Sequence, residues 1–472
     1  MTSAMSLSET PAAKTSHSRM EAGAKRVQQA FRSGRTRPFD WRDQQLDAIQ
    51  QAMIERESDL LASLSDDLGK PRAEALTGEI DFIRKDAAYV AKKYKGWAKA
   101  KSVGTPLATL PGASSLKPEP LGAALILGAW NYPAQQIFNP LIGAIAAGCA
   151  AVCKPSELAP ATAEVIADIG KAYLDAEAIE IVTGGADAAE ALLAEKFDTI
   201  FFTGSAAIGR SVMAAAARHL TPVTLELGGK SPAIVLADCD LEVTARRLVW
   251  GRFMNAGQLC VSPDYVLAEA SIRDALIAAL GKAVEALYGA HPKTSADYGR
   301  IVNHRHFDRL MALMESGRVA HGGDHDRGAK YIAPTVLTDV KLDAPVMQEE
   351  IFGPLLPVIS VDGLDAALDI VNDRPRPLTL YGFSKNKQNA ERIINETSSG
   401  SVLINDTVVF QVNPTLPFGG VGESGTGRFH GRYSFLAFSH EKAVMTRGFS
   451  LDSALRYPPY DEKKLKTLRK LS

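Results

Sequence analysis

Two residues of this sequence, Glu226 and Cys260, suit covalent chemistry on a carbonyl group. Glu226 ends an apolar run and precedes two glycines, which permit a sharp turn. Cys260 follows Gly257, where a helical pattern breaks and leaves the cysteine on a tight loop. A thiolate can attack a carbonyl carbon, and a carboxylate can activate the water that releases the acyl group. The pair therefore predicts an enzyme that works through a covalent acyl intermediate.

A glycine turn between a strand-like run and a helix-like run is the next candidate, in Phe202-Thr203-Gly204-Ser205. Exposed N–H groups at a helix start hold phosphate, so this segment predicts a phosphate or pyrophosphate site. The spacing of Gly204 and Gly209 is closer to the P-loop pattern than to the dinucleotide fingerprint, which keeps a P-loop phosphotransferase as an alternative. Against it, Arg210 replaces the lysine of that pattern, and no metal-binding aspartate follows a strand. A plain helix-packing turn is the third interpretation.

Two more polar segments follow predicted strands. Lys154 and Glu157, in Lys154-Pro155-Ser156-Glu157, could bind ribose hydroxyls at the carboxyl end of a strand, although a solvated charged turn is the simpler interpretation. Asn131, in Trp130-Asn131-Tyr132-Pro133, could donate its amide to an oxyanion or could cap the next helix.

The elements that must position these residues form an α/β chain. From residue 20 to about 101 the apolar pattern is helical, and segment 102–118 is either a linker or an extended ribbon that contacts another subunit. Strand-like runs at 123–127, 150–153, 179–182, 199–202 and 223–227 alternate with helix-like runs, and a second alternation begins after Pro232. This order predicts doubly wound, mostly parallel sheets that bind ligands at the carboxyl ends of their strands.

Composition limits the class of protein. The chain has 472 residues, 46% hydrophobic and 23% charged, which predicts a globular protein of two or three domains. Its formal net charge of -1 gives no general attraction to nucleic acid or anionic membrane. The four cysteines suit neither a disulfide framework nor a metal site. No run is long enough to span a bilayer, and residues 1–19 predict a disordered start without a secretory signal, so we expect a cytoplasmic protein.

Taken together, the motifs resemble the aldehyde dehydrogenase superfamily from about Met20 to Arg447, and within it the class 3 branch, whose members take fatty and aromatic aldehydes. Seven motifs occur in the family's order over about 290 residues. They are Trp130-Asn131-Tyr132-Pro133, Lys154-Pro155-Ser156-Glu157, Phe202-Thr203-Gly204-Ser205, Glu226-Leu227-Gly228-Gly229-Lys230, Gly257-Gln258-Leu259-Cys260, Glu350-Ile351-Phe352-Gly353-Pro354 and Pro417-Phe418-Gly419-Gly420.

The resemblance implies a role for each motif. Cys260 is the implied nucleophile and Glu226 the base that activates the deacylating water, while Asn131 and the Cys260 N–H form the oxyanion hole. The implied cofactor is NAD, with NADP also accepted, and its binding residues are Lys154, Glu157, Gly204, Ser205, Gly209, Glu350 and Phe352. No metal site is implied.

The resemblance also implies how the chain divides into domains and how two copies of it assemble. Residues 20–101 and 119–226 would bind the cofactor, and residues 227–432 would form the catalytic domain. Residues 102–118 and 433–447 would form a β element that joins a homodimer, and residues 448–472 would be a tail. The tail carries three leucines among five basic residues, so at most a weak peripheral contact with anionic membrane is expected.

The predicted reaction is the NAD(P)-dependent oxidation of an aldehyde to the acid through a thiohemiacetal and then a thioester on Cys260. Tyr132, Trp250, Leu259 and Phe418 flank the motifs and could line an apolar tunnel for medium or long aliphatic or aromatic aldehydes; the alternative is that they are ordinary core residues. A P-loop phosphotransferase and a non-catalytic relative stay as other hypotheses. An acylating reductase would not need Glu226 as a base.

Overall fold

The N-terminal fifth of the chain, up to Trp97, is helical in this computed structural model, which describes residues 11–471. Helix α1 (Pro11–Arg32) is followed by α2 (Phe39–Glu55), α3 (Glu57–Leu68), α4 (Arg72–Ala75), a π-helical turn η1 (Leu76–Ile80) and α5 (Asp81–Trp97). The predicted apolar stripe of α2 and α3 is buried, and Gly69 ends α3 in a left-handed conformation (φ 55°). The expected disordered start is wrong for residues 11–19, which belong to α1 because proline is favoured in a first helical turn. Residues 1–10 lie outside the described part.

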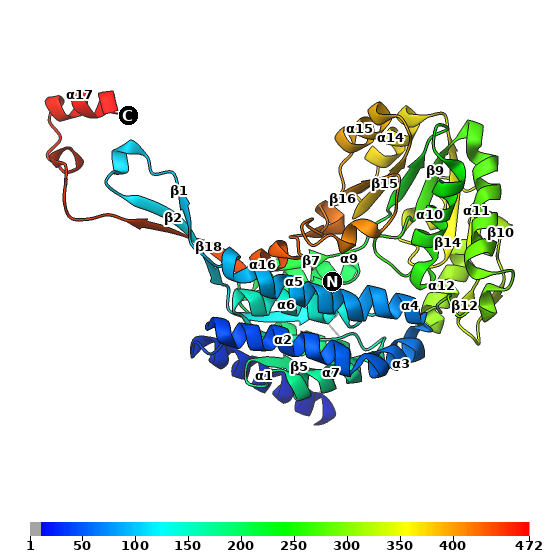
Figure 1. Cartoon of the computed structure of the whole chain (residues 1–472), viewed down its shortest axis with the longest axis horizontal. Coiled ribbons are helices and arrows are strands. Elements are labelled where there is room, and N and C mark those ends of the chain that lie inside the picture. Colours follow the sequence, from blue (N-terminus) through cyan, green and yellow to red (C-terminus); the bar gives the residue numbers. More distant parts are fainter. Residues whose placement is uncertain (1–10, 472) are drawn as a thin grey trace, which may run out of the picture.

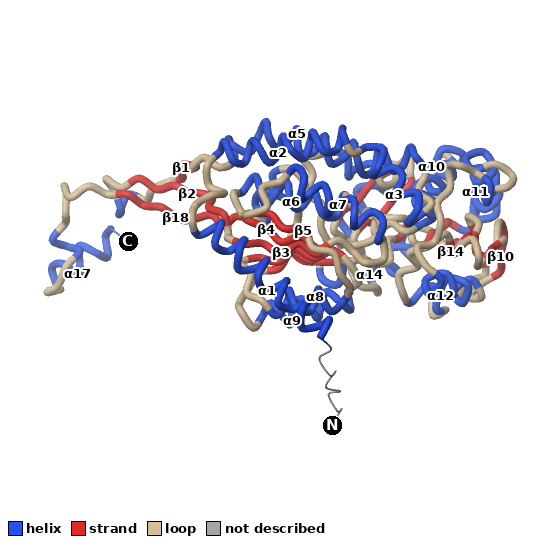
Figure 2. Tube along the Cα trace, turned by 90° about the horizontal axis from the view of Figure 1, so that it is seen from below, coloured by secondary structure: helices blue, strands red, loops and turns tan. Residues whose placement is uncertain are grey.

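The first sheet has six strands in the order β17-β7-β6-β3-β4-β5. All pairs are parallel except β17 with β7. The strands are β3 (Ala123–Leu127), β4 (Ala150–Lys154), β5 (Ile179–Ile181), β6 (Thr199–Thr203), β7 (Val223–Glu226) and β17 (Gly425–Thr426), and the crossover helices are α6 (Gln135–Ala147), α7 (Pro160–Tyr173), α8 (Ala186–Ala194) and α9 (Ala206–Ala217). Helices α1, α8 and α9 lie on one side of this sheet, and α6 and α7, with α2 and α5 outside them, lie on the other (Figure 2).

The second sheet has seven strands in the order β10-β13-β14-β9-β8-β15-β16, and only β10 is antiparallel to its neighbour. They are β8 (Pro232–Val235), β9 (Tyr265–Glu269), β10 (Arg318–His321), β13 (Thr335–Thr338), β14 (Leu355–Val361), β15 (Thr379–Phe383) and β16 (Ser401–Ile404). Around them lie α10 (Leu241–Phe253), α11 (Arg273–Tyr288), α12 (His304–Met314), α13 (Pro345–Gln348), α14 (Leu364–Asn372), α15 (Lys387–Glu396) and the short pair β11 (His325–Asp326) and β12 (Tyr331–Ile332). The predicted doubly wound fold class is confirmed in both units.

A three-stranded ribbon extends away from these two units (Figure 1). It consists of β1 (Lys101–Val103), β2 (Ala113–Pro120) and β18 (Ser439–Thr446), with β18 antiparallel to β2 from Ser439 opposite Pro120 to Thr446 opposite Ala113. Segment 102–118 is therefore part of a ribbon and not a linker, while its contact with another subunit stays a prediction. Residues 432–437 form α16 (Arg432–Ala437), which packs on α6, so the ribbon's second part begins at Ser439 instead of residue 433.

The two units have separate hydrophobic cores, and the boundary between them differs from the predicted one. Side chains after residue 404, among them Val408, Phe418, Phe429 and Phe435, pack in the first core although the sequence analysis assigned residues up to 432 to the second unit. The chain returns to the first unit there because β17 pairs with β7 at its edge. The last described element is α17 (Glu462–Leu471), and none of the helices within residues 11–471 has the length and apolar character needed to cross a bilayer.

Candidate active site

A cavity of about 1240 Å³ lies between the two units. The last residues of four neighbouring strands line it, namely Leu127 of β3, Lys154 of β4, Thr203 of β6 and Glu226 of β7. The carboxyl ends of parallel strands meet at one edge of a sheet, so the predicted location of the ligand site is where the cavity lies. Residues 347–350 and Phe352 of the second unit form part of the opposite wall.

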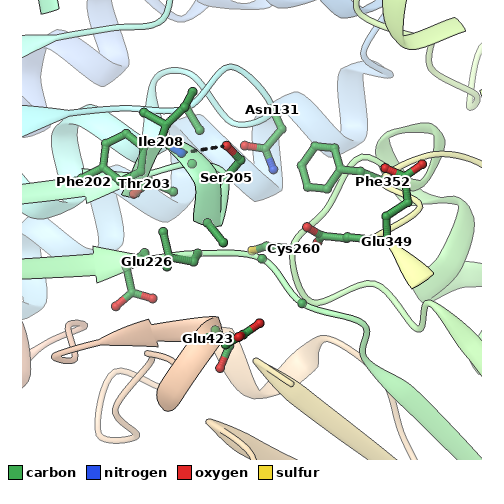
Figure 3. Close-up of a pocket in the computed structure, with 18 of the residues that line it drawn as sticks. Asn131, Phe202, Thr203, Ser205, Ile208, Glu226, Cys260, Glu349, Phe352 and Glu423 are labelled. Atoms are coloured by element: carbon green, nitrogen blue, oxygen red, sulfur yellow. Dashed lines mark hydrogen bonds between the residues drawn. The ribbon is translucent and has the colours of Figure 1, made fainter. Parts of the chain in front are cut away.

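Cys260 is partly exposed to this cavity and follows an unusual turn (Figure 3). Asn255 (φ 51°, ψ 34°), Ala256 (φ 53°, ψ 36°) and Gly257 (φ 76°) are consecutive left-handed residues, two of which are not glycine. Such backbone is strained and is often kept at functional sites. Burial raises the pKa of the Cys260 thiol, and the carboxylates of Glu350 and Glu226 raise it further. Attack by the sulfur therefore needs a group that takes up the thiol proton.

Glu226 is 3% exposed and lines the same cavity (Figure 3). Neither of its carboxyl oxygens has a hydrogen-bond partner among the residues that the structure describes. Because burial penalises the charged form, the pKa of Glu226 lies well above its usual value. A buried carboxyl group without a partner is costly, and one that faces a cavity is free to interact with water or ligand there.

Asn131 is buried next to the loop that carries Cys260. Its Nδ2 donates to the carbonyl oxygen of Gln258 at 3.1 Å. The main-chain carbonyl oxygen of Asn131 accepts from Nζ of Lys70 at 2.8 Å and from Nδ2 of Asn255 at 3.0 Å. These bonds hold the Asn131 amide beside the cysteine loop, as an oxyanion donor requires.

A charged pair behind Asn131, Lys70 and Glu79, is not indicated by any motif in the sequence. Lys70 and Glu79 are fully buried and 2.5 Å apart, and Oε2 of Glu79 accepts the N–H groups of Ala134 and Gln135 at 2.9 and 3.1 Å. Glu79 lies on the π-helical turn η1, and such turns recur at functional sites. The only signal in the sequence was the break at Gly69-Lys70-Pro71, which does not reveal partners that lie 61 residues away in the chain.

Of the residues predicted to hold the phosphates, the structure brings two to the cavity. Gly204 and Ser205 line it, and Oγ of Ser205 accepts the Ile208 N–H at 3.4 Å at the start of α9 (Figure 3). Gly209 does not line it: a Cβ there would lie 2.7 Å from Cδ2 of Leu227, so this glycine allows α9 to pack against Leu227. The helix-packing interpretation is therefore correct for Gly209.

The predicted ribose residues all reach the cavity. Nζ of Lys154, which is buried, lies 3.0 Å from Oε2 of the half-exposed Glu157. Glu350 lies on the opposite wall, and burial, followed by the charge of Asp264, raises its pKa to about 8. A Cβ on Gly228 would lie 1.8 Å from Oε2 of Glu350, so only glycine allows this approach.

Phe352 also lies on this wall, with its ring edge-on to Trp130 at a centroid distance of 5.3 Å. Its backbone is left-handed (φ 47°), which is rare for an aromatic residue.

None of the four predicted substrate residues lines the cavity. Tyr132 is buried under Nζ of Lys70, which lies 3.8 Å from the ring centroid, and Phe418 stacks on Phe410. Leu259 is buried as well, so the core interpretation is correct for these three, because large apolar side chains beside a polar motif face the interior. Trp250 differs: it lies on α10 and is 38% exposed.

Three comparisons with known proteins agree on the family of this chain. The model of the aldehyde dehydrogenase family matches residues 6–444. The chain is 47% identical to aldehyde dehydrogenase family 3 member A2 of Rattus norvegicus over 94% of this chain and 93% of that protein. It is 46% identical to the dimeric NADP-preferring aldehyde dehydrogenase of Canis lupus familiaris over 94% of this chain and 98% of that protein. A solved structure of Staphylococcus aureus AldH in its substrate-bound state superposes with a TM-score of 0.93 at 44% identity, covering 96% and 99% of the two chains.

Two doubly wound units around one cavity define the class of a nucleotide-dependent α/β enzyme. The chain belongs to the aldehyde dehydrogenase family. It is an NAD(P)-dependent enzyme that oxidises aldehydes, which excludes the P-loop phosphotransferase and the non-catalytic relative.

Proposed function

We propose that Cys260 is the nucleophile, Asn131 the oxyanion donor and Glu226 the base of this aldehyde oxidation. The observation that carries the proposal is the arrangement around one cavity of a partly exposed thiol, an amide fixed to the thiol's loop and a carboxyl group without a partner. Hydrolysis of a thioester needs a base, so the position of Glu226 favours release of the acid over transfer of the acyl group to another acceptor.

The first step is attack by the Cys260 sulfur on the aldehyde carbon. The oxygen becomes an oxyanion that accepts hydrogen bonds from the Asn131 amide and the Cys260 N–H, while the thiol proton passes to solvent or to a nearby base. When bound, the nicotinamide supplies the hydride acceptor and a positive charge beside the thiol. The acyl group then stays on Cys260 as a thioester. Glu226 takes a proton from a water molecule, whose oxygen attacks that thioester; the C–S bond breaks, the carboxylic acid leaves, and the proton returns from Glu226 to the sulfur to restore the thiol.

The dinucleotide fits the residues that line the cavity. The start of α9 at Ser205 offers N–H groups and a favourable dipole to a pyrophosphate, and Gly204 and Gly228, which line the cavity, carry no side chain that would cover their backbone. Lys154 and Glu157 would bind the adenosine ribose, and Glu350 would bind the nicotinamide ribose with Phe352 beside the ring. We place the first unit, with 20–101 and 119–226, as the cofactor domain and the second as the catalytic domain.

For the substrate, we propose medium or long aliphatic or aromatic aldehydes. The exposed side chain of Trp250 supports this preference. Its neighbour on α10, Gly251, packs against Thr407, so the segment that carries the exposed side chains of Val409 and Val412 lies close to α10. These side chains could form an apolar approach to the site. If acetaldehyde has the same kcat/KM as hexanal or benzaldehyde, this preference is wrong.

The chain would work as a homodimer joined through its ribbon, as the word dimeric in the name of the canine relative suggests. All four cysteines are free, which suits the reducing cytoplasm. The assay that tests the whole proposal follows reduced nicotinamide by absorbance with a panel of aldehydes and either cofactor. Cys260→Ala should abolish turnover and leave the dissociation constant of NAD, measured by calorimetry, within about twofold. Retained turnover in that variant would remove the covalent mechanism.

A further inference from the structure

Three buried charged side chains, Arg252, Asp264 and Lys230, lie together beside the cavity. The exposed fractions of these side chains are 0%, 3% and 12%. Oδ1 of Asp264 lies 3.0 Å from Nη1 of Arg252, and Oδ2 lies 2.6 Å from Nζ of Lys230. We call these three residues the Asp264 cluster.

The cluster is attached to the segment that carries the nucleophile. Asp264 lies four residues after Cys260, and Nη1 of Arg252 donates to Oγ of Ser262 at 3.2 Å and to the carbonyl oxygen of Pro263 at 3.1 Å. Lys230 lies four residues after Glu226. The cluster therefore joins the segments that follow the proposed nucleophile and the proposed base.

The same cluster holds every second residue of loop 349–353 by its backbone. Nζ of Lys230 donates to the carbonyl oxygen of Glu349 at 3.1 Å. The Ile351 N–H donates to both oxygens of Asp264 at 3.2 and 3.3 Å, and Nη2 of Arg252 donates to the carbonyl oxygen of Gly353. The residues between these three contacts are Glu350 and Phe352, which both line the cavity.

Stability alone does not account for such a cluster. Burial of charges is costly, and apolar side chains of similar volume commonly serve stability as well as a buried ion pair does. Burial lowers the pKa of both Lys230 and Arg252, against the opposing charge of Asp264. Nε of Arg252 also has no hydrogen-bond partner within residues 11–471. The cluster fixes the position of the loop backbone on both sides of Phe352. The left-handed backbone of Phe352 is strained, so it needs such support.

We propose that Arg252 and Asp264 are positioning residues that hold loop 349–353 in register with the Cys260 loop, so that Glu350 and Phe352 place the nicotinamide end of the cofactor against the thiol. The inference rests on the proposed roles of Glu350 and Phe352. Close packing of the two loops supports it, because a Cβ on Gly257 would lie only 2.3 Å from the carbonyl oxygen of Gly353. A guanidinium suits this position, since its planar fork reaches acceptors on both loops at once.

The test compares Arg252→Lys and Arg252→Met with a matched change elsewhere, Arg42→Met. Arg42 is also a buried arginine, and it donates to the carbonyl oxygens of Arg37 and Ala146 at 2.9 and 3.0 Å without lining the cavity. Each variant is measured for its thermal midpoint, for the dissociation constant of NAD by calorimetry, and for KM of the aldehyde. Arg252→Lys keeps the positive charge. If Arg252→Met does not fold, the NAD measurement is made on Arg252→Lys alone.

Both Arg252 variants should raise the dissociation constant of NAD by between about tenfold and a hundredfold, because small displacements of a positioning group have effects of this size. KM of the aldehyde should change by less than about threefold. Arg42→Met should lower the thermal midpoint and leave the dissociation constant of NAD unchanged. If the Arg252 variants lower the midpoint in the same way without weakening NAD, the inference is overturned.

Glu350→Gln separates this inference from the function on which it rests. If Glu350→Gln leaves NAD binding unchanged, the proposed role of Glu350 fails whatever Arg252 does. If it weakens NAD binding, the double variant Arg252→Lys with Glu350→Gln should bind NAD only slightly less well than Glu350→Gln alone, because both changes remove the same contact. Fully additive effects would show that Arg252 does not act through the loop.

Discussion

Neither carboxyl oxygen of Glu226 accepts a hydrogen bond from any of the described residues. Burial favours its protonated form, whereas the role of a base needs the carboxylate. Deacylation should therefore become faster as the pH rises through the raised pKa of Glu226, and slower below it. The thioester itself forms without this group, so acylation and deacylation should separate experimentally.

The substitution Glu226→Gln removes the base and nearly preserves the shape of the side chain. We expect a burst of reduced nicotinamide followed by a steady rate lower by about 10²- to 10⁴-fold, the usual contribution of general base catalysis. Rapid-mixing absorbance measures both phases. The wild-type steady rate should also follow pH as described, and the slow phase of the variant should not. A uniform loss of rate without a burst would contradict the deacylating role.

Glu157 bears on the choice between NAD and NADP. Its carboxylate would accept hydrogen bonds from ribose hydroxyls and repel a 2′-phosphate, but it is half exposed and already paired with Lys154. Solvent weakens such charge effects, so the preference for NAD should be modest. Glu157→Gln should move the ratio of the two kcat/KM values towards NADP by about threefold to tenfold. An unchanged ratio would show that Glu157 does not discriminate between the cofactors.

Residues next to glycines or at strand ends could be found from the sequence, and residues that act through distant partners could not. Glu226, Cys260 and Asn131 each stand in a local pattern that already indicates a turn or a strand end. Arg252 and Lys70 have no such pattern, because their partners Gly353 and Asn131 lie 101 and 61 residues away in the chain. Closeness in sequence to a motif does not place a side chain on the cavity, as Tyr132 shows, because a large apolar side chain beside a polar motif packs into the interior.

The turn at Asn255, Ala256 and Gly257 is an element on which the position of Cys260 depends. Gly257→Ala adds a Cβ at positive φ, 2.3 Å from the carbonyl oxygen of Gly353. We expect a loss of about 1–3 kcal/mol in the free energy of unfolding and a slower burst phase, because the two loops must separate. Gly96→Ala in α5 is the control, since its Cβ would meet open space and alanine favours a helix. Denaturant unfolding and burst kinetics measure both; equal behaviour of the two variants would contradict this account.

The ribbon leaves large apolar side chains exposed, among them Leu107 (84%), Leu110 (47%) and Met445 (50%). A second copy of the chain could cover them. Leu107→Glu with Met445→Glu should raise the dissociation constant of the dimer by about tenfold or more while each unit stays folded, because a buried charge disrupts an apolar interface. Light scattering after size exclusion, with circular dichroism, measures this. Leu220→Glu, at an exposed leucine outside the ribbon, should stay dimeric.

Strands and helices of the two units were predicted well because parallel strands buried on both faces are continuous apolar runs bounded by turns. Strand β3 has the predicted bounds, 123–127. The return of residues 408–438 to the first unit could not be predicted, since it depends on β17, a strand of two residues that carries no periodicity.

Helix α17 lies beside the ribbon at the far end of the molecule from the second sheet (Figure 1). It carries the basic residues predicted for the tail, together with Leu465 and Leu468. Each basic residue near an anionic surface contributes about 1 kcal/mol, so the full chain should bind anionic vesicles weakly at low salt and lose them at moderate salt. Cosedimentation of the full chain and a chain that ends at Pro459 measures this. Equal binding of the two would leave the tail no membrane role.

The pairing of β18 with β2 has a consequence for how the protein is made. Strand β2 is synthesised long before its partner, residues 439–446, and β17, which completes the sheet beside Glu226, likewise follows the other strands of that sheet. Both the ribbon and the edge of the first sheet are therefore incomplete until residues 425–446 have been made. If the ribbon joins two copies as proposed, a nascent chain without β18 has neither a complete ribbon nor a complete sheet edge, so assembly should follow the synthesis of both segments.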